Sequence, residues 1–255
     1  TLRQHPDYDP AGLRRMVALC TGGAPMPAAL IQRFSEDGIT IADGYGMSEA
    51  GTVLGMPIAD RARIVEKAGS AGIPGPTLRL RLVDDEGQDV PDGQVGEIWI
   101  NGPTLSPCYW NRPELPTLAQ QGGWLRTGDA ARRDADGFYY LVDRKKDMFI
   151  SGGENVYPAE VEAAVLELDS VAEVAVIGVP DARWGEVGWA YVVPRAGHQV
   201  TAEQILSHLD GRCARYKRPQ RVIITDSLPR TGSGKVQKHL LRQQAADDTN
   251  PSKSA

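Results

Sequence analysis

The hydrophobic pattern of this chain changes twice, near residues 69 and 144, and this division limits the folds that the chain can adopt. Residues 11–56 alternate short apolar runs with glycine-rich loops and one helical repeat, which is the rhythm of an α/β unit. Residues 69–143 alternate apolar and polar side chains between glycine-containing turns, as half-buried strands do. After residue 144 helical and strand-like segments alternate again, which favours a separate α+β unit.

The first two stretches predict particular elements. We expect strands over residues 17–20 and 39–42, with a helix between them that begins at Pro27, because a helix tolerates proline in its first turn. In the second stretch, residues 78–82 and 97–101 alternate in the manner of strands with one buried face. The density of strands and turns there predicts a small β-barrel or a folded sheet.

The last stretch predicts a small α+β unit. The strands that we expect in it lie at residues 171–179, 190–194 and 222–225. One helix should begin at Pro158, another should follow the capping-box spacing of Thr201 and Gln204, and a last one should cover residues 236–242. Residues 246–255 are expected to form a disordered tail.

Composition narrows the class of protein. The 255 residues are 41% hydrophobic and 24% charged, which is ordinary for a globular protein and argues against long disorder. A net charge of -5 argues against broad binding of nucleic acid. No apolar run approaches the roughly 18 residues that a transmembrane helix needs. Three cysteines without paired spacing indicate neither a disulfide framework nor a zinc site, so we expect a reduced, cytoplasmic protein.

Two glycine-containing segments in the first stretch could bind a ligand. Residues 21–25 would leave the backbone open to a flat ligand, although a plain strand-to-helix turn has the same composition. Within residues 43–49, Tyr45 could stack on a ring, while Ser48 and Glu49 could supply oxygen ligands for Mg²⁺ beside phosphates. A core tyrosine followed by a helix start would explain the same residues.

Further candidates follow in the second half. Asp129, after a glycine turn, could accept hydrogen bonds from both hydroxyls of a ribose, or it could simply cap the turn. The charged run 143–147 marks either a solvated link between units or an ordinary hairpin tip. Gly152 and Gly153 would permit the close approach of a second ligand.

Two apparent motifs do not match their patterns. Residues 229–236 resemble a P-loop, but Pro229 stands in place of the first glycine and Val236 in place of the Ser or Thr that binds Mg²⁺. A flexible glycine loop that carries Lys235 is instead suited to bring a cation to an anionic centre, unless the lysine is merely solvated. Residues 46–50 resemble the nucleophile elbow of serine hydrolases, but Ala50 stands in place of the second glycine of that motif.

Taken in this order and spacing, the segments resemble the adenylate-forming superfamily, which contains acyl-CoA synthetases, peptide-synthetase adenylation domains and beetle luciferases. The resemblance extends to about residue 243 and is nearest to fatty-acyl-CoA synthetases through residues 143–148 and 151–158. It implies an α/β and α+β fold. Residues 1–143 would be the end of a large AMP-binding domain, an α/β layer plus a small β-barrel, and residues 144–245 a mobile lid domain with an α+β fold.

The resemblance also implies roles for individual residues. A nucleotide would be bound by Gly22, Gly23, Ala24, Asp43, Tyr45, Gly46, Ser48, Asp129 and Arg144. Tyr45 would stack on the adenine, and Asp129 with Arg144 would bind the ribose hydroxyls. Glu49 would hold Mg²⁺ and would be a catalytic residue together with Lys235.

The implied reaction has two steps and uses ATP, Mg²⁺, CoA and a carboxylic acid. The acid attacks the α-phosphate to give an acyl-adenylate, and the growing negative charge requires Mg²⁺ and a cation such as Lys235. The CoA thiol then displaces AMP. Lys146 would be the hinge of the lid domain, and Gly152 with Gly153 would enter the site beside the CoA tunnel in the second step.

One part of the family pattern is absent. The sequence contains no Ser/Thr/Gly-rich phosphate loop and starts without methionine, so we expect the C-terminal half of a longer protein that is inactive without its N-terminal half. The expected function is that of a fragment of an AMP-forming acyl-CoA synthetase for a fatty acid, since the apolar residues 51–57 should border the acyl pocket. Aryl-acid CoA ligase, a carrier-protein-dependent adenylation domain and a non-catalytic nucleotide-binding fragment are the alternatives.

Overall fold

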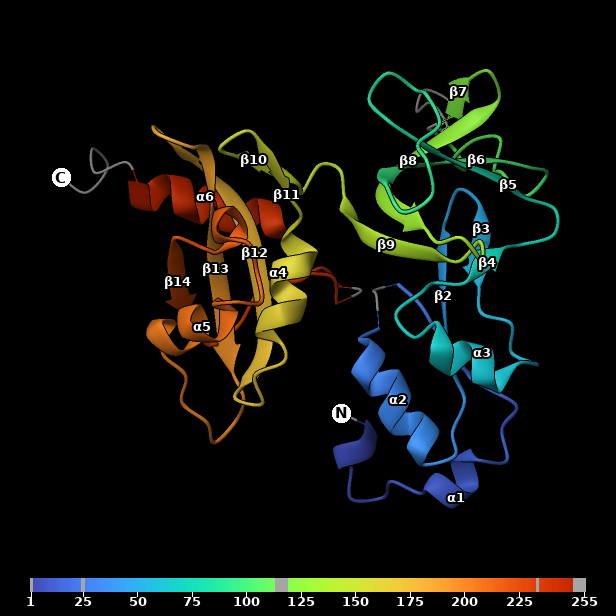
Figure 1. Ribbon diagram of the computed structural model, residues 1–255, viewed down its shortest axis with the longest axis horizontal. Helices are drawn as coiled ribbons and strands as arrows, with labels where there is room; N and C mark the ends of the chain where they lie inside the picture. Colours follow the sequence, from blue (N-terminus) through green and yellow to red (C-terminus); the bar gives the residue numbers. More distant parts are fainter. Residues whose placement is uncertain (1, 24–25, 113–118, 233, 250–255) are drawn as a thin grey trace. The chain divides into compact units, whose positions relative to one another are not determined.

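The computed structural model describes residues 2–23, 26–112, 119–232 and 234–249 of the chain. These residues fall into two compact units that divide between Val142 and Asp143, coloured blue to green and yellow to red in Figure 1. The first unit is built around two sheets and the second around one.

A four-stranded sheet with the order β1-β2-β3-β4 opens the first unit. Its strands are β1 (Leu19–Thr21), β2 (Ile41–Met47), β3 (Gly51–Gly55) and β4 (Ile73–Pro74). The helical segments of this region are the 3-10 helix η1 (Leu2–Gln4), α1 (Pro10–Leu13), α2 (Ala28–Glu36) and α3 (Arg61–Glu66). Strands β1 and β2 run parallel and are joined by α2, whose Phe34 packs in one apolar cluster with Ile41 and Ile64. The α/β order expected for this stretch is therefore confirmed.

Both predicted strands of this sheet have other bounds in the structure, and the second, expected from residue 39, begins at Ile41. The first strand begins at Leu19, and the side chain of Val17 is exposed. The second strand continues through Gly44 and Gly46, which the glycine pattern places in a loop. Glycine is needed inside this strand because a Cβ atom on Gly46 would lie 2.5 Å from the carbonyl oxygen of Gly51 on β3.

The second sheet of this unit is antiparallel, with the order β5-β6-β8-β7 and with β9 paired to β8. The strands are β5 (Arg79–Val83), β6 (Val95–Asn101), β7 (Ala119–Gln121), β8 (Trp124–Arg133) and β9 (Tyr139–Arg144). Ile98 and Ile100 face the core together, as their alternation predicts. Of the two expected forms, the folded sheet is confirmed and the β-barrel is not, because the strand pairs among the described residues form an open sheet. Alternation identifies the buried face of each strand, but it does not show whether the edge strands meet.

The sheet of the second unit is covered by helices on both faces (Figure 1). It contains β10 (Phe149–Ser151), β11 (Glu154–Val156), β12 (Val171–Asp181), β13 (Gly185–Pro194) and β14 (Arg221–Ile224). The helical segments are α4 (Pro158–Val165), α5 (Ala202–Leu209), the 3-10 helix η2 (Arg215–Lys217) and α6 (Lys238–Thr249). Val174 and Val176 of β12 pack with α4 and α5, whereas Ala175 and Ile177 pack with α6. Because alternate residues of a strand point to opposite faces, β12 is buried on both faces.

The ends of the helices test several local predictions. The capping box of α5 is confirmed, since the Thr201 side chain accepts from the Gln204 amide and the Gln204 side chain accepts from the Thr201 amide. Disorder from residue 246 onward is wrong for residues 246–249, which continue α6. The buried side chains of Leu241 and Ala245 hold this helix against the sheet, so its polar end is helical despite weak propensity. Within the described residues, no helix is long and apolar enough to span a membrane.

Candidate functional site

The carboxyl ends of the parallel strands β1 and β2 bring Asp43 beside the loop that follows β1. Asp43 is paired with Thr21 in the sheet. Its carboxylate accepts hydrogen bonds from the Thr21 hydroxyl at 3.0 Å and from the Met26 amide at 3.2 Å. The residue is 4% exposed, and burial raises the pKa of its carboxyl group despite these hydrogen bonds. An acceptor at this edge of parallel strands is well placed for a ligand that donates a hydrogen bond.

The predicted glycine loop follows the same strand edge. A Cβ atom on Gly22 would lie 3.3 Å from the Gly44 carbonyl oxygen, so this glycine lets the loop pass close to β2. Gly23 has a φ of +88°, a conformation that favours glycine, and the space around it is open. Both glycines therefore have a backbone reason to be present, and the open side of Gly23 could also accept a flat ligand. Ala24 lies outside the described residues.

Tyr45 and Asp129 are brought together from different sheets of the first unit. The Tyr45 hydroxyl on β2 donates to Oδ2 of Asp129 on β8 at 2.6 Å, although the residues are 84 positions apart in the sequence. The two side chains are predicted to bind the ring and the ribose of one nucleotide. Their direct contact is consistent with a single site on this unit. Both are half-buried, so each retains a surface that a ligand can reach.

Glu97 contacts the irregular part of β8 that carries Asp129, and no sequence motif points to it. Asp129 lies inside this strand and not in the turn that its neighbouring glycine suggests. Its side chain on β6 is 5% exposed. One carboxylate oxygen accepts from the Gly128 amide at 3.2 Å, and the other faces the Arg126 guanidinium at 3.4 Å. The Thr127 hydroxyl accepts from the Asp129 amide at 3.0 Å. The detectable signal is an acidic residue inside an apolar strand, because such a residue is rarely buried without a partner.

Ser48 and Glu49 lie at the tip of the β2–β3 hairpin and not at a helix start. Ser48 is exposed, and Glu49 is half-buried. The Tyr109 hydroxyl donates a hydrogen bond to Oε1 of Glu49, and this contact with a carboxylate raises the pKa of Tyr109. Tyr109 is a second residue that no sequence motif indicates, because a lone tyrosine in a proline-rich loop has no characteristic spacing.

The residues fit a metal ion that arrives with a substrate. Among the described residues, no group of three or more His, Cys, Asp or Glu side chains could hold a metal ion. Mg²⁺ is commonly bound by one or two carboxylates together with water and substrate phosphates. A single half-buried glutamate such as Glu49 matches that chemistry and does not match a resident metal centre.

The charged run that opens the second unit forms a turn. Asp143 accepts hydrogen bonds from the amides of Arg144 and Ala159, each at 2.7 Å, and so attaches the end of β9 to the start of α4. Lys146 is exposed within the turn that follows. Asp147 forms an ion pair with Arg242 of α6 at 2.8 Å. Arg144 and Lys146 thus lie on a segment that is attached on both sides, and the hinge role of Lys146 stays a prediction.

Gly152 and Gly153 are the two-residue tip of the β10–β11 hairpin, where Ser151 pairs with Glu154. Their φ angles of +63° and +89° are those of a type I′ turn, which requires a positive φ at both positions. The Gly152 amide donates to the Trp184 carbonyl oxygen at 2.8 Å. The glycines are therefore explained by the turn, and their predicted contact with CoA stays a prediction.

Lys235 lies on a closed loop between β14 and α6. Arg230 and Val236 form an antiparallel bridge, and the Thr231 amide donates to the Lys235 carbonyl oxygen at 2.8 Å. Arg230 also pairs with Glu173 of β12 at 2.6 Å. The loop thus has more internal structure than its glycines indicate. The Lys235 side chain is exposed, and its ammonium group has no hydrogen bond or ion pair within the described residues.

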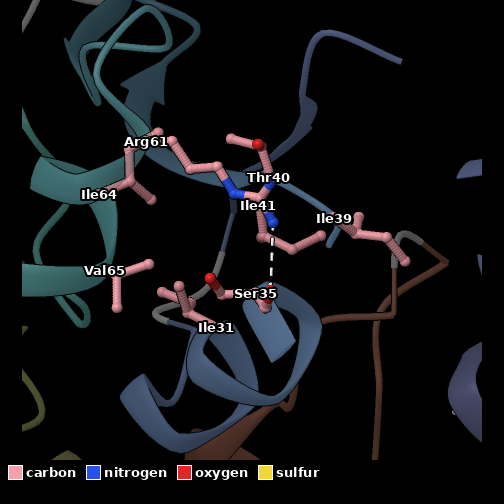
Figure 2. Close-up of a pocket in the computed structure, with 8 residues that line it drawn as sticks. All are labelled: Ile31, Ser35, Ile39, Thr40, Ile41, Arg61, Ile64 and Val65. Carbon is pink, nitrogen blue, oxygen red and sulfur yellow. Dashed lines mark hydrogen bonds between the residues drawn. The ribbon is translucent and has the colours of Figure 1, made fainter. Parts of the chain in front are cut away.

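A small apolar crevice lies between α2, β2 and α3 (Figure 2). Arg61 closes one side of it by donating to the Ser35 carbonyl oxygen at 3.1 Å. The eight residues that line it include none of the predicted site residues. We interpret the crevice as a packing gap of the core beneath the sheet.

Two family models match the chain. The model of the AMP-binding enzyme matches residues 1–110, and the model of the AMP-binding enzyme C-terminal domain matches residues 160–235. The matched segments contain most of the predicted site, including Asp43, Glu49 and Lys235.

Similar curated proteins are CoA ligases. Feruloyl-CoA synthase from an Amycolatopsis species is 46% identical over 240 residues, which are 94% of this chain and 48% of the relative. A long-chain-fatty-acid–CoA ligase from Mycobacterium tuberculosis is 41% identical over 246 residues, which are 95% of this chain and 48% of the relative. The chain thus spans about half the length of the curated relatives it matches.

A solved structure shows the same fold. ATP-bound MatB from Rhodopseudomonas palustris superposes with a TM-score of 0.87 at 34% identity, over 97% of this chain and 49% of that chain. The fold and the matched segments are those of the adenylate-forming superfamily. The chain belongs to the AMP-binding enzyme family.

Proposed function

We propose that these residues contribute nucleotide-binding strands and the C-terminal domain of an AMP-forming acid–CoA ligase. The observation that carries the proposal is the hydrogen bond between Tyr45 and Asp129. It joins two motifs from separate sheets at one place, as contact with the ring and the ribose of one nucleotide would require. The names of the relatives support ligation to CoA.

The side chains can serve this chemistry in distinct ways. Tyr45 offers a ring for stacking, and Asp129 offers oxygens to the ribose hydroxyls, which would displace the Tyr45 hydroxyl. The exposed ammonium of Lys235 can stabilise the negative charge that develops as the carboxylate attacks the α-phosphate. A Mg²⁺ ion held by Glu49 would supply further charge neutralisation at the phosphates. Closure of the second unit would exclude water before the adenylate forms.

The substrate that we propose is an apolar carboxylic acid, aryl or fatty. The two relatives are named for feruloyl-CoA and for a long-chain fatty acid, so the relatives support both kinds of acid. The apolar residues 51–57 do not discriminate between them. Val53 and Leu54 on β3 are fully buried in the core, which explains their apolar character without an acyl pocket.

The test measures AMP release from ATP by the native reading frame that contains these residues. Ferulic acid, benzoic acid and fatty acids of several lengths are supplied separately, with and without CoA. Release that requires both an acid and CoA supports the ligase and ranks its substrates. Release that needs an acid but not CoA would favour the carrier-protein alternative. Absence of release with every acid, from a protein that binds AMP, would favour the non-catalytic alternative.

A further inference from the structure

The segment that follows β6 returns to the tip of the β2–β3 hairpin and holds Glu49 at two points. The Ser106 amide donates to the backbone carbonyl oxygen of Glu49 at 2.7 Å. The Tyr109 hydroxyl donates to Oε1 of the Glu49 side chain. Between these contacts, the Ser106 hydroxyl donates to the Cys108 carbonyl oxygen at 2.9 Å, which turns the chain so that Tyr109 reaches the carboxylate.

We propose that Tyr109 is a positioning residue that sets the Glu49 carboxylate for the metal ion of the nucleotide complex. The hydroxyl engages Oε1, and Oε2 has no hydrogen bond within the described residues. The carboxylate is therefore presented with one oxygen fixed and the other available. This inference rests on the proposed function, because that function requires a metal-bound nucleotide at Glu49.

The physical reason is the freedom of the glutamate side chain. Glu49 lies at a hairpin tip and is half-buried, so without Tyr109 its carboxylate could rotate among several rotamers. Ordering such a side chain has an entropic cost at the moment a metal binds. Hydrogen bonds from outside the ligand shell remove that cost, and their loss typically weakens metal binding about 10–100-fold. We expect the lower end here, because Glu49 is only partly buried.

A purely structural role would give a different result. The same contact could serve only to anchor the loop to the hairpin, in which case removing the hydroxyl would loosen both the loop and the nucleotide site. Trp110, the next residue, provides a matched control. Its side chain is 90% exposed, so Trp110→Phe alters an aromatic residue of the same loop without touching Glu49.

The experiment compares Tyr109→Phe, Glu49→Gln and Trp110→Phe with the wild type in the native reading frame. Mn²⁺ replaces Mg²⁺, and free Mn²⁺ is counted by electron paramagnetic resonance in the presence of a non-hydrolysable ATP analogue. Calorimetric titration with AMP in a chelating buffer gives the affinity without metal. Neither measurement depends on turnover.

We expect Tyr109→Phe to weaken Mn²⁺ binding about tenfold and to leave metal-free AMP affinity unchanged. Glu49→Gln should weaken Mn²⁺ binding further, and Trp110→Phe should behave like the wild type. The proposal is overturned if Tyr109→Phe binds Mn²⁺ as Trp110→Phe does, or if it loses metal-free AMP affinity by the same factor. A wild type that binds neither nucleotide, or a Glu49→Gln protein with full Mn²⁺ affinity, would overturn the proposed function as well.

Discussion

Replacement of Glu97 tests how the part of β8 that carries Asp129 is held. Glu97→Ala removes the acceptor of the Gly128 amide and the partner of Arg126. Glu97→Gln keeps a side-chain oxygen that can still accept from the Gly128 amide, but it removes the charge. Arg126→Met keeps the Gly128 hydrogen bond and removes the ion pair, together with the cation–π contact of Arg126 with the Trp99 ring. The three variants therefore separate the hydrogen bond from the electrostatic attraction.

The expected losses in the free energy of unfolding follow from the surroundings of each group. A buried amide that loses its acceptor costs about 1–3 kcal/mol, and the partly buried Gly128 amide should lie toward the lower end. The ion pair contributes at most about 1 kcal/mol, because the Arg126 side chain is 46% exposed and water screens it. With a small cavity included, Glu97→Ala should lower the free energy of unfolding of the first unit by about 2–4 kcal/mol. Glu97→Gln and Arg126→Met should each lower it by about 1 kcal/mol or less.

Urea unfolding followed by circular dichroism measures these differences, and an AMP titration on the same proteins measures the consequence for the site. AMP affinity should fall for Glu97→Ala and should be nearly kept in Arg126→Met, because only the first change frees the Gly128 amide beside Asp129. If Glu97→Gln is as unstable as Glu97→Ala, the carboxylate acts through its charge and the hydrogen-bond argument is refuted.

Three further substitutions and one assay of the unchanged chain test other parts of the molecule. Burial raises the pKa of Asp43 above its ordinary value of 3.8. The folded state therefore loses stability relative to the unfolded state as pH rises above 3.8 and the carboxyl group ionises. The melting temperature of Asp43→Asn should therefore rise relative to that of the wild type as the pH is raised from 4 to 7. A difference in melting temperature that stays constant over this pH range would contradict the burial argument. Leu209, the last residue of α5, is fully buried against the sheet, so Leu209→Ala should lower the free energy of unfolding by about 2–5 kcal/mol in urea unfolding. Lys235→Met in the native reading frame should slow acid-dependent pyrophosphate exchange about 10²–10³-fold with AMP affinity kept, and an equal loss of both would indicate a binding role. The 255-residue chain alone should release no AMP from ATP with acid and CoA, because its sequence contains no phosphate loop, and measurable turnover would refute this.

Sequence patterns predict the local structure of this chain well where one residue type has one physical use. The capping box at Thr201 and Gln204 predicts the start of α5 because few other arrangements satisfy the free amides of a first turn. The alternation of Ile98 and Ile100 predicts a shared buried face, since strands have a period of two. The helix over residues 246–249 is not predictable in this way, because its stability comes from packing of Leu241 and Ala245 and not from its own polar residues.

The side chains that hold the candidate site residues are less predictable from the sequence, because they make long-range contacts. Tyr109 reaches Glu49 across 60 positions, and Glu97 reaches Gly128 across 31. Neither pair has a sequence spacing that distinguishes it from chance. The resemblance identifies Glu49, whereas only the fold identifies the side chain that holds it.

The glycines and the acidic residues of the candidate site differ in what they reveal about function. Gly46 is explained by strand packing and Gly152 by turn geometry, so neither requires a ligand. Asp43 is different, because its burial raises its pKa and its charge therefore costs stability that an apolar side chain would not cost. A buried carboxylate that faces a loop at the carboxyl edge of parallel strands is suited to accept a hydrogen bond from a ligand, and this role of Asp43 stays a prediction. The gain in stability expected for Asp43→Asn should accordingly be accompanied by a loss of AMP affinity.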